Sequence, residues 1–276
     1  MAELKGVFDL HIHSAPDIRE RKHDDLELLR KAQNMGVEGF VLKSHQFPTA
    51  ERAWLLNKLA QKSIAYGSIT LNYAVGGLNP AAVRYALELG AKIVWLPTID
   101  AKNHRMKEEK QGGISVIKGK AVVSELLEIM LIIKEYNAVL ATGHISKDEI
   151  DVVLKTATDT GISNIVVTHP EFHIVGLSIE DQIEIVSKYD NVYFERTFAQ
   201  PIGKGNYQNN LQANLEAINK VGYQTTLVST DSGQVENPPW NESLPDYINF
   251  LKENGAKEEE VDWMIKKLPM KLLNLN

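Results

Sequence analysis

The chain has 276 residues, of which 43% are apolar and 24% charged, a composition typical of a folded globular protein rather than a disordered one. It contains no cysteine, so disulfides, iron–sulfur clusters and thiol nucleophiles are excluded, and any bound metal needs nitrogen and oxygen ligands. The formal net charge of −6 argues against a nucleic-acid surface, which needs clustered lysine and arginine.

The length of the apolar runs indicates where in the cell the protein is expected. The first residues lack the apolar core of a signal peptide. The most apolar run, 126–133, is interrupted by Glu128 and is far shorter than the ~20 residues of a membrane span. We therefore expect a cytoplasmic protein with neither a membrane nor a nucleic acid as partner.

Short apolar segments recur along the chain and predict buried strands. Their nearly continuous apolar character is typical of parallel strands that are covered on both faces. The segments between them carry helix signals, such as the capping pairs Ser146 with Glu149 and Ser178 with Asp181. The expected strands lie at 6–11, 39–42, 64–70, 92–96, 138–142, 164–168, 191–194 and 224–229.

Eight strand–helix units with short links predict an α/β fold, a single (β/α)8 TIM barrel over residues 1–276, rather than an open sheet. Three intervals that follow strands are long, namely 99–120, 198–208 and 232–244. Active sites of such barrels lie at the C-terminal ends of the strands. We expect a lid from the first interval and two specificity walls from the others, with plain solvated loops as the alternative.

Histidines gather where the expected strands end. His11 and His13 end the first strand, His144 the fifth and His169 the sixth, while Asp231 follows the eighth. Side chains two apart on a strand share a face, so His11 and His13 converge if that face is the barrel interior. A lone histidine at a strand end is more often a hydrogen-bonded structural residue. The coincidence in one barrel register, however, predicts a metal site of nitrogen and oxygen ligands.

Four motifs carry these residues: FDLHIH at the first strand, ATGHI at the fifth, VVTHP at the sixth and STDSG at the eighth. With the C-terminal MIKKLPMKLLNL, which is similar to a closing helix, they resemble the amidohydrolase superfamily of metal-dependent barrel hydrolases over essentially the whole chain. The resemblance implies one or two divalent metal ions, zinc first, with manganese, iron, nickel or cobalt open. His11, His13 and Asp231 would bind the buried ion. His144 and His169 would bind a second ion, or one of them would contact substrate.

Lys43 marks a departure from that family pattern. Many members with two metals carry a bridging carboxylated lysine or a glutamate near the end of the fourth strand, where this chain has WLPT. Lys43 follows the second strand instead, in VLKSHQFPT, on the same face as His45. Three roles stay open for Lys43: an electrostatic contact to the substrate, a metal bridge in carboxylated form, or simple packing.

Three further residues are candidate substrate contacts. Arg19, on the first loop, could bind a substrate carboxylate through two parallel hydrogen bonds. Glu195, in YFERT, could face the site as a ligand, base or substrate contact, or form an ion pair at the rim. His45 is the third candidate.

We expect a metal-dependent hydrolase in which a metal-bound hydroxide attacks a small amide, lactone, ester or cyclic imide. In this hypothesis Asp231 moves the proton and Lys43 acts on the carbonyl. The alternatives are a decarboxylase or isomerase with one metal, a PHP-type phosphoesterase, and a barrel that binds a metal or metabolite without catalysis. The expected partner is a small-molecule substrate, anionic if Arg19 binds it, and a homo-oligomer stays open.

Overall fold

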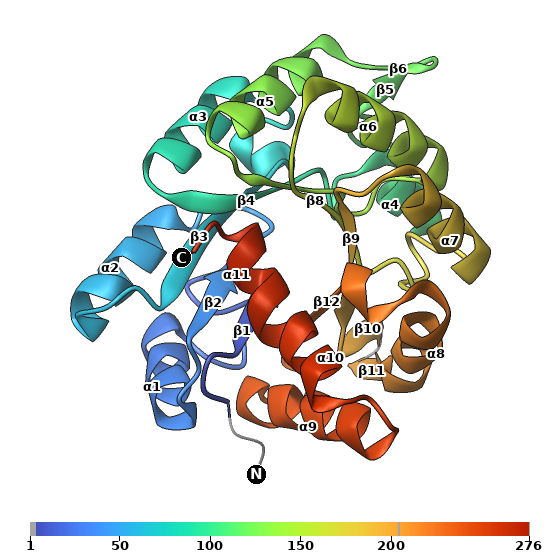
Figure 1. The fold of residues 1–276 in the computed structure, drawn as a ribbon. Coiled ribbons are helices and arrows are strands. Elements are labelled where there is room, and N and C mark those ends of the chain that lie inside the picture. The colour runs from blue at the N-terminus through green and yellow to red at the C-terminus, as the bar shows by residue number, and fades with distance from the viewer. Residues whose placement is uncertain (1–3, 204, 276) are drawn as a thin grey trace.

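Eight parallel strands form a barrel at the centre of the molecule (Figure 1), which confirms the predicted α/β fold. The structure is a computed structural model that describes residues 4–203 and 205–275. The strands follow the order β1-β2-β3-β4-β7-β8-β9-β12. Their bounds are β1 (Phe8–Ile12), β2 (Gly39–Leu42), β3 (Ala65–Thr70), β4 (Ala91–Trp95), β7 (Val139–Ala141), β8 (Ile165–Thr168), β9 (Val192–Thr197) and β12 (Thr226–Ser229).

The barrel closes at a seam between β1 and the segment that follows β12. The amide of Asp231 donates to the carbonyl of His11 at 3.0 Å, and the amide of His13 donates to the carbonyl of Ser232 at 2.8 Å. The last strand begins at Thr226, two residues later than expected, because 223–225 form a 3-10 turn.

Helices surround the barrel (Figure 1). The capping pairs predicted at Ser146 and Ser178 both form, since each serine accepts from the amide of the acidic residue three positions later. The helices are α1 (Asp25–Met35), α2 (Ala50–Ala60), α3 (Pro80–Glu88), α4 (Lys102–Lys107), α5 (Ser124–Glu135), α6 (Lys147–Thr160), α7 (Ile179–Lys188), α8 (Leu211–Val221), α9 (Trp240–Glu253), α10 (Glu258–Asp262) and α11 (Leu268–Leu272).

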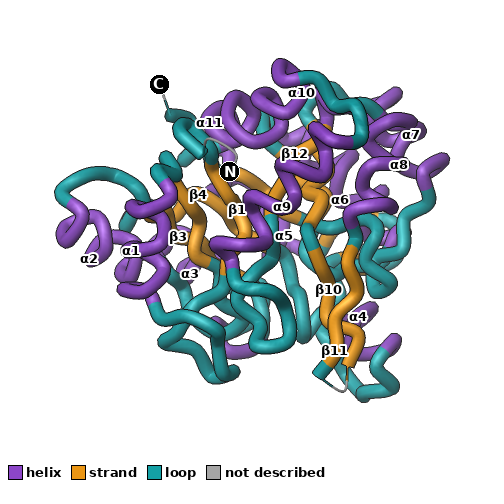
Figure 2. Tube along the Cα trace, turned by 90° about the horizontal axis from the view of Figure 1, so that it is seen from below, coloured by secondary structure: helices purple, strands orange, loops and turns teal. Residues whose placement is uncertain are grey.

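Two antiparallel hairpins lie in the long intervals after β4 and β9. The first pairs β5 (Ile117–Lys118) with β6 (Ala121–Val122), and the second pairs β10 (Ala199–Gly203) with β11 (Asn206–Asn209). Figure 2 shows β10 and β11 extending away from the barrel strands. Apolar periodicity did not predict them, because β11 is exposed and polar along its whole length.

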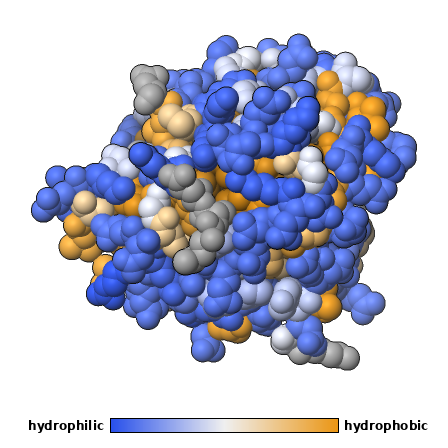
Figure 3. Space-filling view, turned by 60° about the horizontal axis from the view of Figure 1, so that its bottom comes forward, coloured by the Kyte–Doolittle hydropathy of each residue, from blue (hydrophilic) through white to orange (hydrophobic). Residues whose placement is uncertain are grey.

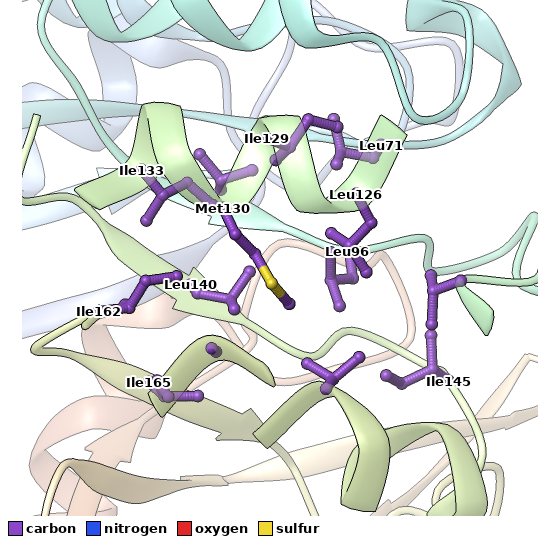
Figure 4. Packing of buried hydrophobic residues seen from close by; sticks show 14 of the residues in the cluster. Leu71, Leu96, Leu126, Ile129, Met130, Ile133, Leu140, Ile145, Ile162 and Ile165 are labelled. Carbon is purple, nitrogen blue, oxygen red and sulfur yellow. The ribbon is translucent and has the colours of Figure 1, made fainter. Parts of the chain in front are cut away.

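Two apolar layers hold the barrel together. Inside it, residues such as Phe8 and Ile93 pack against Leu268 and Leu272 of α11, which crosses the N-terminal end of the barrel (Figure 1). Outside it, side chains of α3, α5 and α6 pack on the strands, as Figure 4 shows for Met130 beside Leu140. The C-terminal helix therefore closes one end, and the opposite end is left for the site.

The surface gives no sign of a membrane-spanning element. Figure 3 shows a mostly hydrophilic face with separate hydrophobic patches. In the described part of the chain, none of the helices combines the length and apolar character needed to cross a bilayer.

Candidate metal centre

Two glycines in the sequence motifs allow neighbouring strand ends to pack closely against each other. Gly233, in STDSG, has a φ of 116°, and a Cβ there would lie 1.9 Å from the carbonyl oxygen of His13. Gly143, directly before His144, has a φ of 61°, and its Cβ would lie 2.4 Å from the carbonyl oxygen of Leu96. Only glycine satisfies both the left-handed backbone and the lack of space.

His11, His13 and Asp231 form a compact buried cluster at the C-terminal end of the barrel. Asp231 Oδ1 lies 3.1 Å from His11 Nε2 and 3.2 Å from His13 Nε2. Each residue offers one ligand atom within 4.8 Å of the other two. Two imidazoles and a carboxylate at this spacing fit a divalent metal ion with room for a further ligand.

His11 and Asp231 of this cluster line a cavity of about 390 Å³. The three long intervals expected to surround the site all contribute to its wall, as Ile99, Gln200 and Gln234 illustrate. Movement of the first interval as a lid stays a prediction. The lining residues are His11, Arg19, Arg21, Lys43, His45, Ile99, His104, Glu108, His144, His169, Phe172, His173, Ile174, Gln200, Pro201, Ile202, Asp231, Gln234 and Glu236.

Strained backbone accompanies two of the candidate residues. Asp231 and His169 have φ values of 53° and 27°, although neither is glycine. Such conformations cost on the order of 1–3 kcal/mol and recur at functional sites, where surrounding contacts hold them. Two hydrogen bonds hold Asp231 in this conformation. Its backbone amide donates to the carbonyl of His11, and Gln234 Nε2 donates to its Oδ1 at 3.0 Å.

Lys43 and Glu195 contact the two ring nitrogens of His11. Lys43 Nζ lies 2.9 Å from Nε2, and Glu195 Oε2 lies 3.1 Å from Nδ1. Because a carboxylate can only accept, Nδ1 carries a proton, and Nε2 is the nitrogen that would bind a metal ion after losing its own proton. Glu195 is fully buried and is not among the residues that line the cavity. The geometry therefore favours an orienting role for Glu195 over the substrate contact expected from the sequence.

Positively and negatively charged groups lie close together in and around the buried cluster. Burial opposes a charged imidazole, but the carboxylates of Asp231 and Glu195 raise the pKa of His11 to about 9. Burial also favours a neutral Asp231, yet His11 and His13 hold its pKa well below the usual range. Burial lowers the pKa of Lys43 to about 8. Such perturbed groups, gathered in a cavity, are typical of functional sites.

His144, His169 and His45 lie around the cluster without joining it. The ring centroids of His169 and His11 are 6.1 Å apart, and those of His144 and His169 are 4.9 Å apart. His45 lies against His13, and its Nδ1 is 2.8 Å from Thr98 Oγ1. Among the described residues only one group of three has the spacing of a metal site. A second ion at His144 and His169 stays a prediction.

Two arginines add positive charge to the cavity wall. Arg21 is paired with Asp17, with 2.9 Å between Nη2 and Oδ2. Arg19 is exposed at the rim, and its guanidinium contacts no carboxylate in the described part of the chain. Arg19 is therefore free to bind an anionic group.

Sequence reasoning missed two supports of the site. Asp9 accepts hydrogen bonds from Thr230 Oγ1 at 2.6 Å and Trp240 Nε1 at 2.9 Å, so it ties β1 to the segment after β12 and to α9. Burial raises the pKa of Asp9 to about 6. His104 lies on α4 and lines the cavity beside His144. The aspartate in FDLH was a visible signal, whereas no local pattern marked His104.

Comparison with solved structures supports the architecture. The chain is similar to an amidohydrolase from Pseudomonas aeruginosa, with 13% identity, a TM-score of 0.67, and coverage of 97% of this chain and 95% of the other. It is similar to a structure from Pseudomonas putida described as a 2-pyrone-4,6-dicarboxylic acid hydrolase, with 14% identity, a TM-score of 0.63, and coverage of 99% and 98%. The third is a 2,6-dihydroxybenzoate decarboxylase from Rhizobium, with 13% identity, a TM-score of 0.54, and coverage of 98% and 99%.

At these identities the likeness shows the fold alone, and it confirms the α/β barrel. A search of curated proteins gave no match. The family model that matches residues 6–195, more than half of the chain, is described as a family of unknown function, DUF6282, and the protein belongs to that family.

Proposed function

We propose that this protein is a metal-dependent hydrolase that acts on a small amide, lactone, ester or cyclic imide carrying an anionic group. The observation that carries the proposal is the buried cluster of His11, His13 and Asp231, of which His11 and Asp231 line the cavity at the C-terminal end of the barrel. A divalent metal held there would supply Lewis-acid chemistry, polarising a carbonyl and making water more acidic.

The chain's own residues would have distinct roles in this reaction. Asp231, besides holding the metal, would accept a proton from the attacking water and pass it to the leaving group. Lys43 Nζ, buried beside His11, would stabilise negative charge that develops on the substrate oxygen. Glu195 would keep the Nε2 lone pair of His11 available.

The anionic character of the substrate rests on the cavity wall. Arg19 offers a free guanidinium at the rim, and guanidinium groups bind carboxylates through paired hydrogen bonds. His45, on the same side as His13, would contact the substrate between the rim and the cluster. Two neighbours are named for carboxylic acids, a 2-pyrone-4,6-dicarboxylic acid hydrolase and a 2,6-dihydroxybenzoate decarboxylase, and this supports the proposed substrate class.

A decarboxylase with one metal is the second candidate, and Lys43 is the observation that favours it. The ammonium group of Lys43 lies 2.9 Å from His11 Nε2, so a fixed positive charge stands beside the cluster. Such a charge could hold a carboxylate at the reacting centre and replace a second ion. The products separate the two candidates, because a decarboxylase releases carbon dioxide and a hydrolase adds water to its substrate.

Metal analysis tests the shared premise. Protein purified from zinc-supplemented and manganese-supplemented cultures should hold at least one divalent ion per chain by mass spectrometry. Asp231→Ala and His13→Ala should lose most of it, while His23→Gln, a matched change outside the cavity, should keep it. A metal-free wild type, or full occupancy in Asp231→Ala, would contradict the proposal. Loaded protein is then assayed on carboxylate-bearing lactones, amides and esters.

A further inference from the structure

Two buried histidine rings contact each other in the cavity wall, outside the cluster described above. His104 Nδ1 and His144 Nδ1 are 2.6 Å apart, and the rings are stacked with 4.8 Å between their centroids. Two imidazole nitrogens at this distance share one proton, so one ring donates and the other accepts. Which ring donates decides the chemistry of His144.

Glu108 resolves the direction of this hydrogen bond. Its Oε2 lies 3.3 Å from His104 Nε2, and Lys110 Nζ lies 2.7 Å from the same oxygen. Because Glu108 is ion-paired with Lys110, its carboxylate is ionised and can only accept. His104 Nε2 must then carry a proton.

The remaining nitrogens follow from the neutral state of both rings. Both rings are buried, and burial disfavours a charged imidazole. A neutral His104 with a proton on Nε2 has its lone pair on Nδ1, so the shared proton belongs to His144 Nδ1. His144 then keeps its lone pair on Nε2, and the residue lines the cavity.

We propose that Glu108 and His104 are positioning residues that fix His144 in the Nδ1–H tautomer and present its Nε2 lone pair to the cavity. The side chain of Asn103, also on α4, supports the main chain of His144. Asn103 Nδ2 donates to the carbonyl of His144 at 3.1 Å and to that of Ile174 at 2.9 Å. The short helix after β4 thus holds both the main chain and the side chain of His144.

The proposed tautomer of His144 does not depend on the proposed function. Its consequence for metal binding or catalysis rests on that function. If His144 is a metal ligand or a base, a lone pair held toward the cavity is ready for that role without a change of tautomer. If His104 only packs, the tautomer of His144 is indifferent to it. A spectroscopic measurement separates these cases.

Long-range 1H–15N correlation spectra of the metal-free, full-length protein labelled at histidine nitrogens report each tautomer directly. The His144 signals are assigned by their loss in His144→Gln. We expect the Nδ1–H tautomer in the wild type and in His104→Asn, whose amide oxygen can accept the same proton. We expect a mixed or inverted tautomer in His104→Phe and in Glu108→Leu, a partly exposed position that should fold normally. His173→Phe, in the same cavity wall, is the control and should leave His144 unchanged.

An Nε2–H tautomer of His144 in the wild type, or an unchanged tautomer in His104→Phe and Glu108→Leu, would overturn the proposal. Zinc affinity, measured by chelator competition, then tests the consequence. His104→Phe should bind zinc roughly 10- to 100-fold more weakly, as is usual for the partner of a ligating histidine, and His104→Asn should restore binding. A changed tautomer with unchanged zinc affinity supports the positioning role and contradicts the assignment of His144 as a metal ligand.

Discussion

At the scale of single residues, one nitrogen atom organises the centre of the site. His11 Nε2 has Asp231 Oδ1 at 3.1 Å and Lys43 Nζ at 2.9 Å, while Glu195 occupies the other ring nitrogen. Each of these charges would be costly to bury alone. Together they compensate one another, so removing any one of them changes the ionisation of the rest.

Lys43 makes this coupling measurable through pH. Burial lowers its folded-state pKa from 10.5 to about 8, so between these values the unfolded chain binds more protons than the folded one. Lys43 therefore makes the free energy of unfolding rise as pH increases from 8 to 10.5. The raised pKa of His11 acts in the opposite direction up to pH 9, so the net rise of the metal-free wild type is expected between pH 9 and 10.5. Below pH 8 the burial of charged Lys43 lowers the free energy of unfolding by about 3 kcal/mol.

Urea denaturation of metal-free protein at pH 9 and 10.5, above the pKa of His11, checks this prediction. Lys43→Met removes the titrating group and should flatten the rise, while Lys58→Met, an exposed position on α2, should follow the wild type. If the free energy of unfolding depended on pH in the same way in the wild type and in Lys43→Met, the lowered pKa of Lys43 would be contradicted.

The residues that sequence reasoning placed at the cavity share a local signal. His11 and His13 alternate on one strand, and Asp231 lies in a short motif directly after another, so barrel geometry alone brings them to one end. His104 has no such signal, because its approach to His144 depends on the path of the long interval after β4. The contact between Glu195 and Nδ1 of His11 could not be predicted either, because sequence periodicity does not show which ring nitrogen a neighbouring side chain contacts.

At the scale of elements, a buried ion pair ties the loop after β8 to β9. Arg196 is fully buried, and its guanidinium pairs with Glu171, which lies two residues beyond His169. Gln182 of α7 also donates to Glu171, at 3.3 Å. The pair thus holds the loop that carries His169 and Phe172 into the cavity.

Glu171→Ala should leave Arg196 as an uncompensated buried charge and destabilise the protein by roughly 3–5 kcal/mol in urea denaturation. The matched control is Glu135→Ala, which breaks the exposed pair with Arg84 and should cause no measurable change. Equal effects of the two variants would show that the buried pair does not restrain the loop.

Prediction of elements succeeded where burial is regular. All eight barrel strands were visible as apolar runs because both of their faces are covered, with errors of one to three residues at most ends. The β5–β6 and β10–β11 hairpins were not visible, since β11 is exposed along its length and β5 and β6 are two-residue strands that are too short for an apolar pattern. Of these elements, β10 contributes Gln200, Pro201 and Ile202 to the cavity wall, where loops rather than the scaffold determine what binds.

At the scale of the whole molecule, the candidate metal site lies across the barrel seam. His11 and His13 belong to the first strand and its end, and Asp231 follows the last strand. The backbone bonds across this seam include those from Asp231 to His11 and from His13 to Ser232. A metal bound by all three side chains would therefore link the two ends of the sheet.

Zinc should accordingly stabilise the entire fold. Free zinc at 1,000 times its dissociation constant contributes about 4 kcal/mol, and for a chain of this size that raises the Tm by roughly 10 °C. Thermal unfolding with and without zinc measures the shift, and a chelator should reverse it. Hydrogen exchange of the His13 and Asp231 amides should slow in parallel, because these groups form the seam. His13→Ala should abolish the stabilisation and His23→Gln should retain it; equal zinc-induced shifts in both variants would place the metal elsewhere.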